Sequence, residues 1–267
     1  MKNEQYSAGY NEELIRLFKN RSVYNNAKFF IPYLKNGDTI LDCGSGPGTI
    51  TVGLAKTNPQ SHVFGIDISL EQIETARKYA EDQNVTNVIF QKGNVKNLPF
   101  EDNYFDSVFA HALLQHLANP IHVLSEIHRV LKPGGVVGIR DDDQGSLILS
   151  PYTEKMERLF RLFRDYKNYC GGDAYVGRKQ KYLLREAGFS DIIATASCEY
   201  DSTFEQTNKR AIIADKLLSH MNNDFLKLGW TTKEEILELS KTVKEWGKNQ
   251  DAFDVIVWCE AVGYKKC

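Results

Sequence analysis

The strongest constraint on the fold of this chain is a glycine-rich turn between two apolar segments. Residues 41–48 read Leu-Asp-Cys-Gly-Ser-Gly-Pro-Gly, which places Gly44, Gly46 and Gly48 at alternate positions. Apolar residues precede the turn, and apolar residues at helical spacing follow it at once, so the turn joins a strand to a helix. Because glycine has no Cβ atom, three glycines here let the backbone approach a ligand closely.

A carboxylate follows the next predicted strand. Residues 63–66 are a short apolar segment, and Asp67 comes directly after them. In a doubly wound sheet, ligands bind at the carboxyl ends of the strands, where an acidic residue can bind both hydroxyls of a ribose. We therefore expect the turn and Asp67 to bind a nucleoside together, although a helix N-cap is an alternative role for Asp67.

The spacing of the glycines restricts the kind of nucleoside. The turn is G-x-G-x-G with Asp42 before it, whereas a dinucleotide fingerprint is G-x-G-x-x-G. No Lys-Ser/Thr pair follows the glycines, which excludes a phosphate-binding P-loop. A carboxylate at Asp42 disfavours a diphosphate and suits a ligand with an amino group or a positive charge.

This combination resembles the class I S-adenosylmethionine (SAM)-dependent methyltransferases, whose first motif is an acidic residue followed by G-x-G-x-G. The resemblance is close over residues 28–145, and it includes the Leu-Lys-Pro-Gly-Gly turn at residues 131–135, a frequent marker of this family. The subgroup it looks most like methylates small molecules in ubiquinone and menaquinone biosynthesis. The resemblance implies SAM as cofactor, S-adenosylhomocysteine as product, and a Rossmann-like seven-stranded α/β sheet with an antiparallel last strand.

The resemblance also implies which residues bind the cofactor. In the family the third-strand end contacts the adenine, usually through Asp. Here Asn94 stands there, and its amide oxygen can still accept a hydrogen bond, although a turn residue is an alternative reading. The expected cofactor-binding residues are Asp42, Cys43, Gly44, Ser45, Gly46, Gly48, Asp67, Ile68, Asn94, Val95, His111 and Tyr10.

Methyl transfer needs an aligned acceptor, exclusion of water and, for some acceptors, a general base. His111 and His116 follow the fourth strand, and a neutral imidazole can act as a base near physiological pH. Leucines make the same segment amphipathic, so either His can instead pack or cap there. Asp141 is the third candidate for catalysis.

Asp141 belongs to the run Arg140-Asp141-Asp142-Asp143 after the fifth strand. Neighbours on an extended backbone point to opposite faces, so we expect no metal site. We expect Arg140 to pair with one of the three carboxylates, Asp141 or Asp143 to face the acceptor, and Asp142 to lie in a solvated loop. Further candidates are Tyr175 and Arg178 beside the acceptor and Tyr6, Tyr10 and Tyr24 over SAM.

Strand and helix patterns alternate from about residue 38 to 140, which is typical of a parallel sheet with crossover helices. Beyond this region the patterns predict helices at 152–167, 178–187, 204–228 and 232–246, and strands at 192–200 and 253–262. Earlier helices are expected at 11–19, 22–34, 71–83 and 119–131. We expect an N-terminal helical lid (1–34), a SAM-binding core (35–200), a helical insertion (201–250) and a final core strand (251–267).

Bulk composition excludes several classes of protein. Among 267 residues the formal net charge is −2, which argues against sequence-independent nucleic-acid binding. The five cysteines are scattered without a C-x-x-C pair, so a disulfide framework or zinc site is not expected and a cytoplasmic location is the simpler reading. We expect no signal peptide and no membrane span. The oligomeric state stays open.

The leading hypothesis is a SAM-dependent methyltransferase that acts on an O, N or C atom of a small organic acceptor. RNA or protein methylation is an alternative, and a catalytically silent SAM-binding regulatory protein is another. RNA base methyltransferases of this fold often carry Asn/Asp-Pro-Pro-aromatic after the fourth strand. His111-Ala112-Leu113-Leu114 stands in that place, which disfavours methylation of base amino groups.

Overall fold

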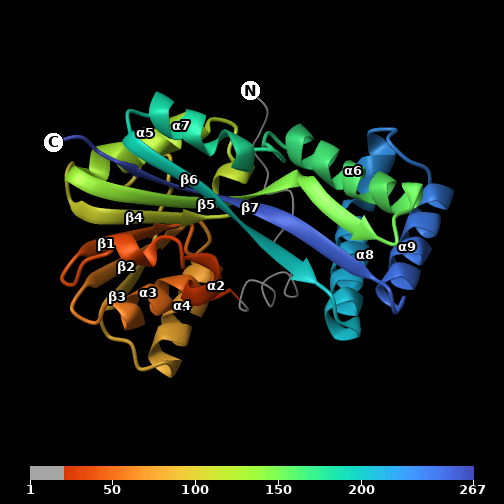
Figure 1. Cartoon of the computed structure of the whole chain (residues 1–267), viewed down its shortest axis with the longest axis horizontal. Helices are drawn as coiled ribbons and strands as arrows, with labels where there is room; N and C mark the ends of the chain where they lie inside the picture. Colours follow the sequence, from red (N-terminus) through yellow and green to blue (C-terminus); the bar gives the residue numbers. More distant parts are fainter. Residues whose placement is uncertain (1–20) are drawn as a thin grey trace.

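The computed structural model describes residues 21–267, and its centre is one seven-stranded sheet (Figure 1). The spatial order is β3-β2-β1-β4-β5-β7-β6, in which β1 to β5 pair in parallel and β7 is antiparallel to both neighbours. The strands are β1 (Thr39–Cys43), β2 (His62–Asp67), β3 (Val88–Lys92), β4 (Phe105–His111), β5 (Leu131–Ser150), β6 (Ser190–Asp201) and β7 (Phe253–Tyr264). This arrangement confirms the predicted seven-stranded α/β sheet with an antiparallel last strand, and β7 lies between β5 and β6.

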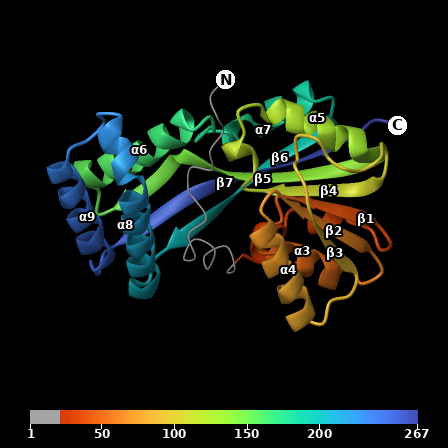
Figure 2. The ribbon, with the colours of Figure 1, turned by 180° about the vertical axis from the view of Figure 1, so that it is seen from behind.

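Helices cover both faces of the sheet (Figures 1 and 2). One face carries α2 (Val23–Asn26), α3 (Thr49–Thr57) and α4 (Leu70–Asp82), and the other carries α5 (Pro120–Val130) and α7 (Gln180–Glu186). Three short 3-10 helices complete this region: η1 (Ile31–Tyr33), η2 (Leu114–His116) and η3 (Gly177–Lys179). Phe30 packs directly on β5, where a Cβ atom at Gly138 would lie 2.3 Å from its ring.

A third group of helices lies at the far ends of β5 and β7 (Figure 1). It consists of α6 (Glu154–Tyr169), α8 (Phe204–Lys227) and α9 (Lys233–Gly247). These helices share an apolar cluster that includes Leu159, Leu218, Phe225 and Trp246. The two helices predicted between the last strands are therefore present, and they have a hydrophobic core of their own.

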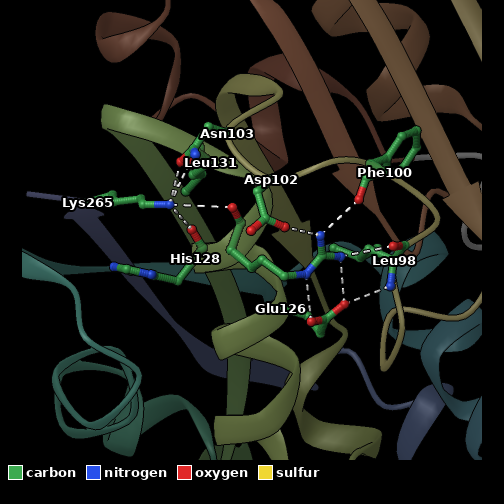
Figure 3. Close-up of polar contacts among 9 residues, drawn as sticks. Leu98, Phe100, Asp102, Asn103, Glu126, His128, Leu131 and Lys265 are labelled. Atoms are coloured by element: carbon green, nitrogen blue, oxygen red, sulfur yellow. Dashed lines mark hydrogen bonds and ion pairs between the residues drawn. The ribbon is translucent and has the colours of Figure 1, made fainter. Parts of the chain in front are cut away.

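The amino ends of the central strands are held by two basic side chains (Figure 3). Lys265 Nζ donates to the carbonyls of His128 and Leu131, each at 2.8 Å, where α5 ends and β5 begins. The Arg129 guanidinium donates to Glu126 and to the carbonyls of Leu98 and Phe100. The Lys265 contacts satisfy carbonyls at the C-terminus of α5, and the Arg129 contacts tie the loop before β4 to this helix.

Two local predictions are wrong. The helix expected at 22–34 is reduced to α2 and η1, because Pro32 lacks the N–H that a continuous helix needs. The loop expected after Ile139 is the continuation of β5, which pairs with β7 as far as Ser150. The helix expected at 11–19 lies outside the described residues.

Within residues 21–267, no helix combines the length and the apolar character that a membrane span requires.

Candidate functional site

The glycine turn leaves β1 in a backbone conformation that glycine favours. Gly44, Gly46 and Gly48 have φ angles of +77°, +50° and +80°. A Cβ atom at Gly48 would lie 2.7 Å from Cβ of Ala76, so this glycine lets α3 and α4 pack closely. Nothing lies within 4 Å of a Cβ placed at Gly46, so the backbone faces open space there. Glycine is therefore favoured at all three positions by the positive φ angles, and at Gly48 also because a side chain would clash with α4.

The open space is a cavity of about 260 Å³ at the carboxyl ends of β1, β2, β3 and β4. This volume is close to the lower end of small-molecule sites, roughly 300–1,000 Å³. The predicted residues that line it are Asp42, Gly44, Ser45, Gly46, Asp67, Ile68, Asn94, Val95, His111 and His116. Cys43, Gly48 and Asp141 are not on its wall, and Tyr10 lies outside the described residues.

Asp42 lies on the cavity wall and is almost wholly buried. Its Oδ2 accepts a 2.6 Å hydrogen bond from Thr51 Oγ1 of α3. Burial raises the pKa of the Asp42 carboxyl to about 7, against the opposing effect of the Thr51 hydrogen bond. A positive charge bound beside this carboxylate would favour its ionised form.

Asp67 ends β2 and holds two backbone groups. Its Oδ2 accepts from the Gly46 amide at 3.0 Å, and its Oδ1 accepts from the Ser69 amide at 2.9 Å. Burial raises the pKa of this carboxyl. A carboxylate has about four acceptor positions, so Asp67 can also accept a hydrogen bond from a ribose hydroxyl. Ser69, and not Asp67, is the N-cap of α4, so the alternative role for Asp67 is wrong.

Asn94 lies on the cavity wall just past β3, next to Val95. Its Oδ1 accepts a 3.0 Å hydrogen bond from the Lys96 amide and so also closes a local turn. The turn reading and the ligand reading are compatible, because a carbonyl oxygen has a second lone pair and the amide NH₂ has two donors.

His111 ends β4 and is 6% exposed. Burial lowers the pKa of its imidazole well below the usual range, and the charges of Arg21 and Arg140 act in the same direction. Neither ring nitrogen has a hydrogen-bonding partner within the described part of the chain. His111 is therefore neutral at physiological pH and offers an acceptor nitrogen on the cavity wall.

His116 belongs to η2 and lines the same cavity. Burial lowers the pKa of its ring well below the usual range, with Lys167 and Arg21 as further causes. The neighbouring Gln115 fixes this turn: its amide donates to Asp141, its carbonyl accepts from the Asp173 amide at 3.0 Å, and its side chain accepts from Lys167 Nζ. Segments on β5 and α6 thus hold the turn that presents His116.

Asp141 is fully buried beneath η2 and away from the cavity. Its Oδ1 accepts from the Gln115 amide at 3.1 Å. Burial raises the pKa of this carboxyl to about 8, so it is largely protonated at neutral pH. The contact with Gln115 positions the η2 turn that bears His116. The Asp141 carboxyl itself does not line the cavity.

The other expectations for this acidic run need correction. Arg140 pairs with Glu199 and Glu260, and with none of the three aspartates. Asp142 is buried and belongs to β5, so the solvated loop is wrong. Asp143 is paired with Arg178, whose guanidinium also lies over the Tyr175 ring. Tyr24 is 68% exposed and does not line the cavity.

Three residues that contribute to the site could not be predicted from the sequence. Arg21 lines the cavity, Lys167 holds the η2 turn, and Trp258 packs against His111. Arg21 and Lys167 belong to segments without a motif, and Trp258 lies within an apolar strand pattern, so none of them carries a local signal. Within residues 21–267, no group of three metal-ligating side chains is placed to hold a metal ion.

Comparisons with known proteins agree with this architecture. A family model described as a methyltransferase domain matches residues 34–188. The protein named "Probable methyltransferase ltbC" from Aspergillus luteorubrus is 30% identical, over 97% of this chain and 97% of its own. A demethylmenaquinone methyltransferase of Lactobacillus johnsonii is 31% identical over 61% of this chain and 72% of its own.

A solved structure shows the same fold over most of the chain. Phosphoethanolamine N-methyltransferase 2 of Haemonchus contortus, in complex with S-adenosylhomocysteine, superposes with a TM-score of 0.57 at 21% identity. The match covers 91% of this chain and 52% of that protein. Sheet order and glycine turn define a class I methyltransferase fold, a class that uses SAM. The chain belongs to the methyltransferase domain family.

Proposed function

We propose that this protein transfers a methyl group from SAM to a small organic acceptor. One observation carries the proposal: a single cavity is bordered by the glycine turn, by the carboxylates of Asp42 and Asp67, and by two neutral histidines. The first two elements suit the cofactor. His111 ends β4 and His116 lies just past it, so both rings face the cavity beside the glycine turn.

The residues present fit SAM. The open space at Gly46 admits a ligand against the backbone, and Asp67 is already oriented by the Gly46 amide. The buried Asp42 carboxylate suits the ammonium group of the methionine part, because a buried charge needs a partner of opposite sign. We assign the adenine edge to Asn94 and Val95 and the ribose to Asp67.

SAM supplies a reactive methyl group on a positively charged sulfur. The chain then has three tasks: to orient the acceptor, to exclude water, and to take a proton where the acceptor carries one. We assign the last task to His111, whose neutral ring lies on the cavity wall without a protein partner among the described residues. We assign His116 to the acceptor wall and Asp141 to positioning the turn that bears it.

Several observations support a small acceptor over RNA. The segment His111–Leu114 has no Phe, Tyr or Trp on which a flipped base could stack, and Leu114 is fully buried. The Lactobacillus johnsonii relative is named for the methylation of demethylmenaquinone, an organic molecule and not an RNA. The cavity is also of small-molecule size.

The test is a transfer assay with SAM labelled at the methyl group. The full chain is incubated with a small-molecule extract, with total RNA, or with a protein extract. We expect label in the small-molecule fraction alone, and roughly 10²–10⁴-fold less of it with His111→Phe if the acceptor loses a proton. Label in RNA or protein would replace the small-molecule proposal, and binding of SAM without any transfer would support the silent regulatory alternative.

A further inference from the structure

A buried lysine joins the helical group to the turn that bears His116. The helical group consists of α6, α8 and α9, at the far ends of β5 and β7 (Figure 1). Lys167 lies in the last turn of α6 and is 8% exposed. Its Nζ donates a hydrogen bond to the side-chain oxygen of Gln115, the middle residue of η2. A charged side chain from the helical group thus reaches the segment behind the cavity wall.

Gln115 is held at three further points. Its amide donates to Asp141 on β5 at 3.1 Å, and its carbonyl accepts from the Asp173 amide at 3.0 Å. Gly172 packs against the same carbonyl, because an added Cβ would lie 2.3 Å from the Gln115 oxygen. Residues 167–173, at the C-terminal end of α6, therefore contact both the side chain and the carbonyl of Gln115.

The positive charge of Lys167 is only partly balanced. The Asp142 Oδ1 atom lies 3.9 Å from Nζ, beyond hydrogen-bonding distance. Burial lowers the pKa of Lys167, and the nearby carboxyls of Asp142 and Asp141 oppose this effect. A buried charge is costly, and a well-packed apolar side chain of similar volume often leaves a protein as stable or more stable. The contact with Gln115 therefore points to a role for Lys167 in placing η2, beyond packing.

The helix that carries Lys167 is tied to the rest of the helical group. Arg158 Nε donates to Glu235 of α9 at 2.8 Å, and the Tyr166 hydroxyl donates to Asp224 of α8 at 2.5 Å. Apolar side chains of α6 are also buried in the cluster that α8 and α9 share. A displacement of these helices would therefore move Lys167 as well.

Resting on the proposed function, we propose that Lys167 is a positioning residue: through Gln115 it holds His116 against the acceptor, so that the helical group determines the shape of the acceptor wall. His116 follows Gln115 directly and lines the cavity. No described residue of α6, α8 or α9 lines the cavity itself. The helical group therefore acts on the site through the η2 turn.

The test compares Gln115→Met with Lys167→Met in the full chain. Both variants remove the hydrogen bond between α6 and η2, and only the second also removes a charge. Burial, together with the charges of Lys167 and Arg21, holds the pKa of His116 well below the usual range. In Gln115→Met, where Lys167 remains, we expect this pKa to rise toward the usual value because the released turn admits water. NMR signals of the His116 ring protons, followed against pH, measure this.

Methyl transfer is the second readout. Labelled SAM is incubated with the small-molecule extract and each variant, and transfer should fall roughly 10–100-fold in both, because a misplaced acceptor wall misaligns the reactants. If the two residues act through one contact, the double variant should lose no more than the weaker single variant retains. The affinity for S-adenosylhomocysteine should hold, because the glycine turn and Asp67 are unchanged.

A matched control lies on the same helix. Lys155 also belongs to α6 and also pairs with a carboxylate, that of Glu238 on α9, but it is exposed and far from η2 in sequence. Lys155→Met should leave both the His116 signals and the transfer of label unchanged. Where Lys167→Met does not fold, Gln115→Met decides the inference.

The outcomes separate this inference from the proposed function. If wild type transfers label, and Gln115→Met leaves both the His116 titration and the transfer unchanged, the positioning role is overturned and the methyltransferase proposal stands. A fall in melting temperature with an unchanged His116 titration would assign Lys167 to stability alone and would also overturn it. If wild type transfers no label and binds no S-adenosylhomocysteine, the proposed function fails, and the His116 titration still tests whether Lys167 and Gln115 hold η2.

Discussion

Thr51 on α3 donates a 2.6 Å hydrogen bond to the carboxylate of Asp42 at the end of β1, and both side chains are buried. This contact opposes the effect of burial, which raises the pKa of Asp42 to about 7. The helix that begins at the glycine turn therefore also stabilises the ionised form of a cavity carboxylate. Cofactor binding and the protonation of Asp42 are linked through this pair.

Thr51→Val should weaken S-adenosylhomocysteine binding, and the effect should grow as the pH falls. Without the hydroxyl, the pKa of Asp42 rises further, so less carboxylate is available near neutral pH for the ligand ammonium group. We expect a loss of roughly tenfold at about pH 6 and a smaller loss at about pH 8.5, where Asp42 is ionised in both proteins. Titration calorimetry measures this. Thr57→Val is the control, because this hydroxyl bonds α3 carbonyls and the Asn58 side chain, away from Asp42. Equal losses at both pH values would contradict the link to Asp42.

Substitutions of the turn glycines by Ala should affect the stability of the fold and the binding of S-adenosylhomocysteine to different degrees. At Gly46 and Gly37, with φ of +50° and +89°, an added Cβ has open space, so Ala should cost only about 1–2 kcal/mol of backbone strain. At Gly48 the Cβ would also meet Ala76 and Phe90 at 2.7 and 2.8 Å, so Gly48→Ala should lower the melting temperature most. Gly46→Ala should lose S-adenosylhomocysteine binding, whereas Gly37→Ala should retain it. Retained binding in Gly46→Ala would place the ligand elsewhere.

Asp141→Asn should stabilise the protein at neutral and alkaline pH. The pKa of this carboxyl is about 8 in the folded state and about 3.9 when unfolded, so the folded state keeps a proton that the unfolded state has lost. Stability from this group is full below about pH 4 and falls as the pH rises to about 8. An Asn side chain keeps an oxygen that accepts from the Gln115 amide. It has no carboxyl that must stay protonated in the folded state, so its stability does not fall as the pH rises. The melting temperature difference between variant and wild type should therefore grow from pH 5 to pH 8. A constant difference, like that expected for exposed Asp82→Asn, would refute it.

Lys265→Met should destabilise the fold without touching the cofactor site. Its ammonium group satisfies the carbonyls of His128 and Leu131 and the side chain of Asn103 (Figure 3). Loss of a charged donor from partly buried carbonyls costs about 1.5–3 kcal/mol. Urea unfolding should show this loss, and exposed Lys266→Met should show almost none. Unchanged stability in Lys265→Met would mean that water replaces the ammonium group.

Much of the sheet could be predicted because its signals are local. The positive φ values of Gly44, Gly46 and Gly48 follow from a turn that three glycines mark, and α8 and α9 follow from helical periodicity. The place of Asp67 follows from its position at a strand end.

The rest depends on contacts between residues distant in sequence. Arg140 and the aspartates after it look like a polar loop, but pairing with β7 extends β5 through them. The partners of Arg140 lie 59 and 120 residues away, so no local pattern could identify Glu199 and Glu260. Asp141 likewise acquires its role from Gln115 on another segment.

Titration of the purified chain with S-adenosylhomocysteine, beside Asp67→Ala and the exposed-site control Asp82→Ala, tests whether this cavity binds SAM. We expect about micromolar binding by wild type and Asp82→Ala, roughly −8 kcal/mol, a strong loss in Asp67→Ala, and no binding of NAD. Binding unaffected by Asp67→Ala, or binding of NAD in place of S-adenosylhomocysteine, would contradict the assignment of this cavity to SAM.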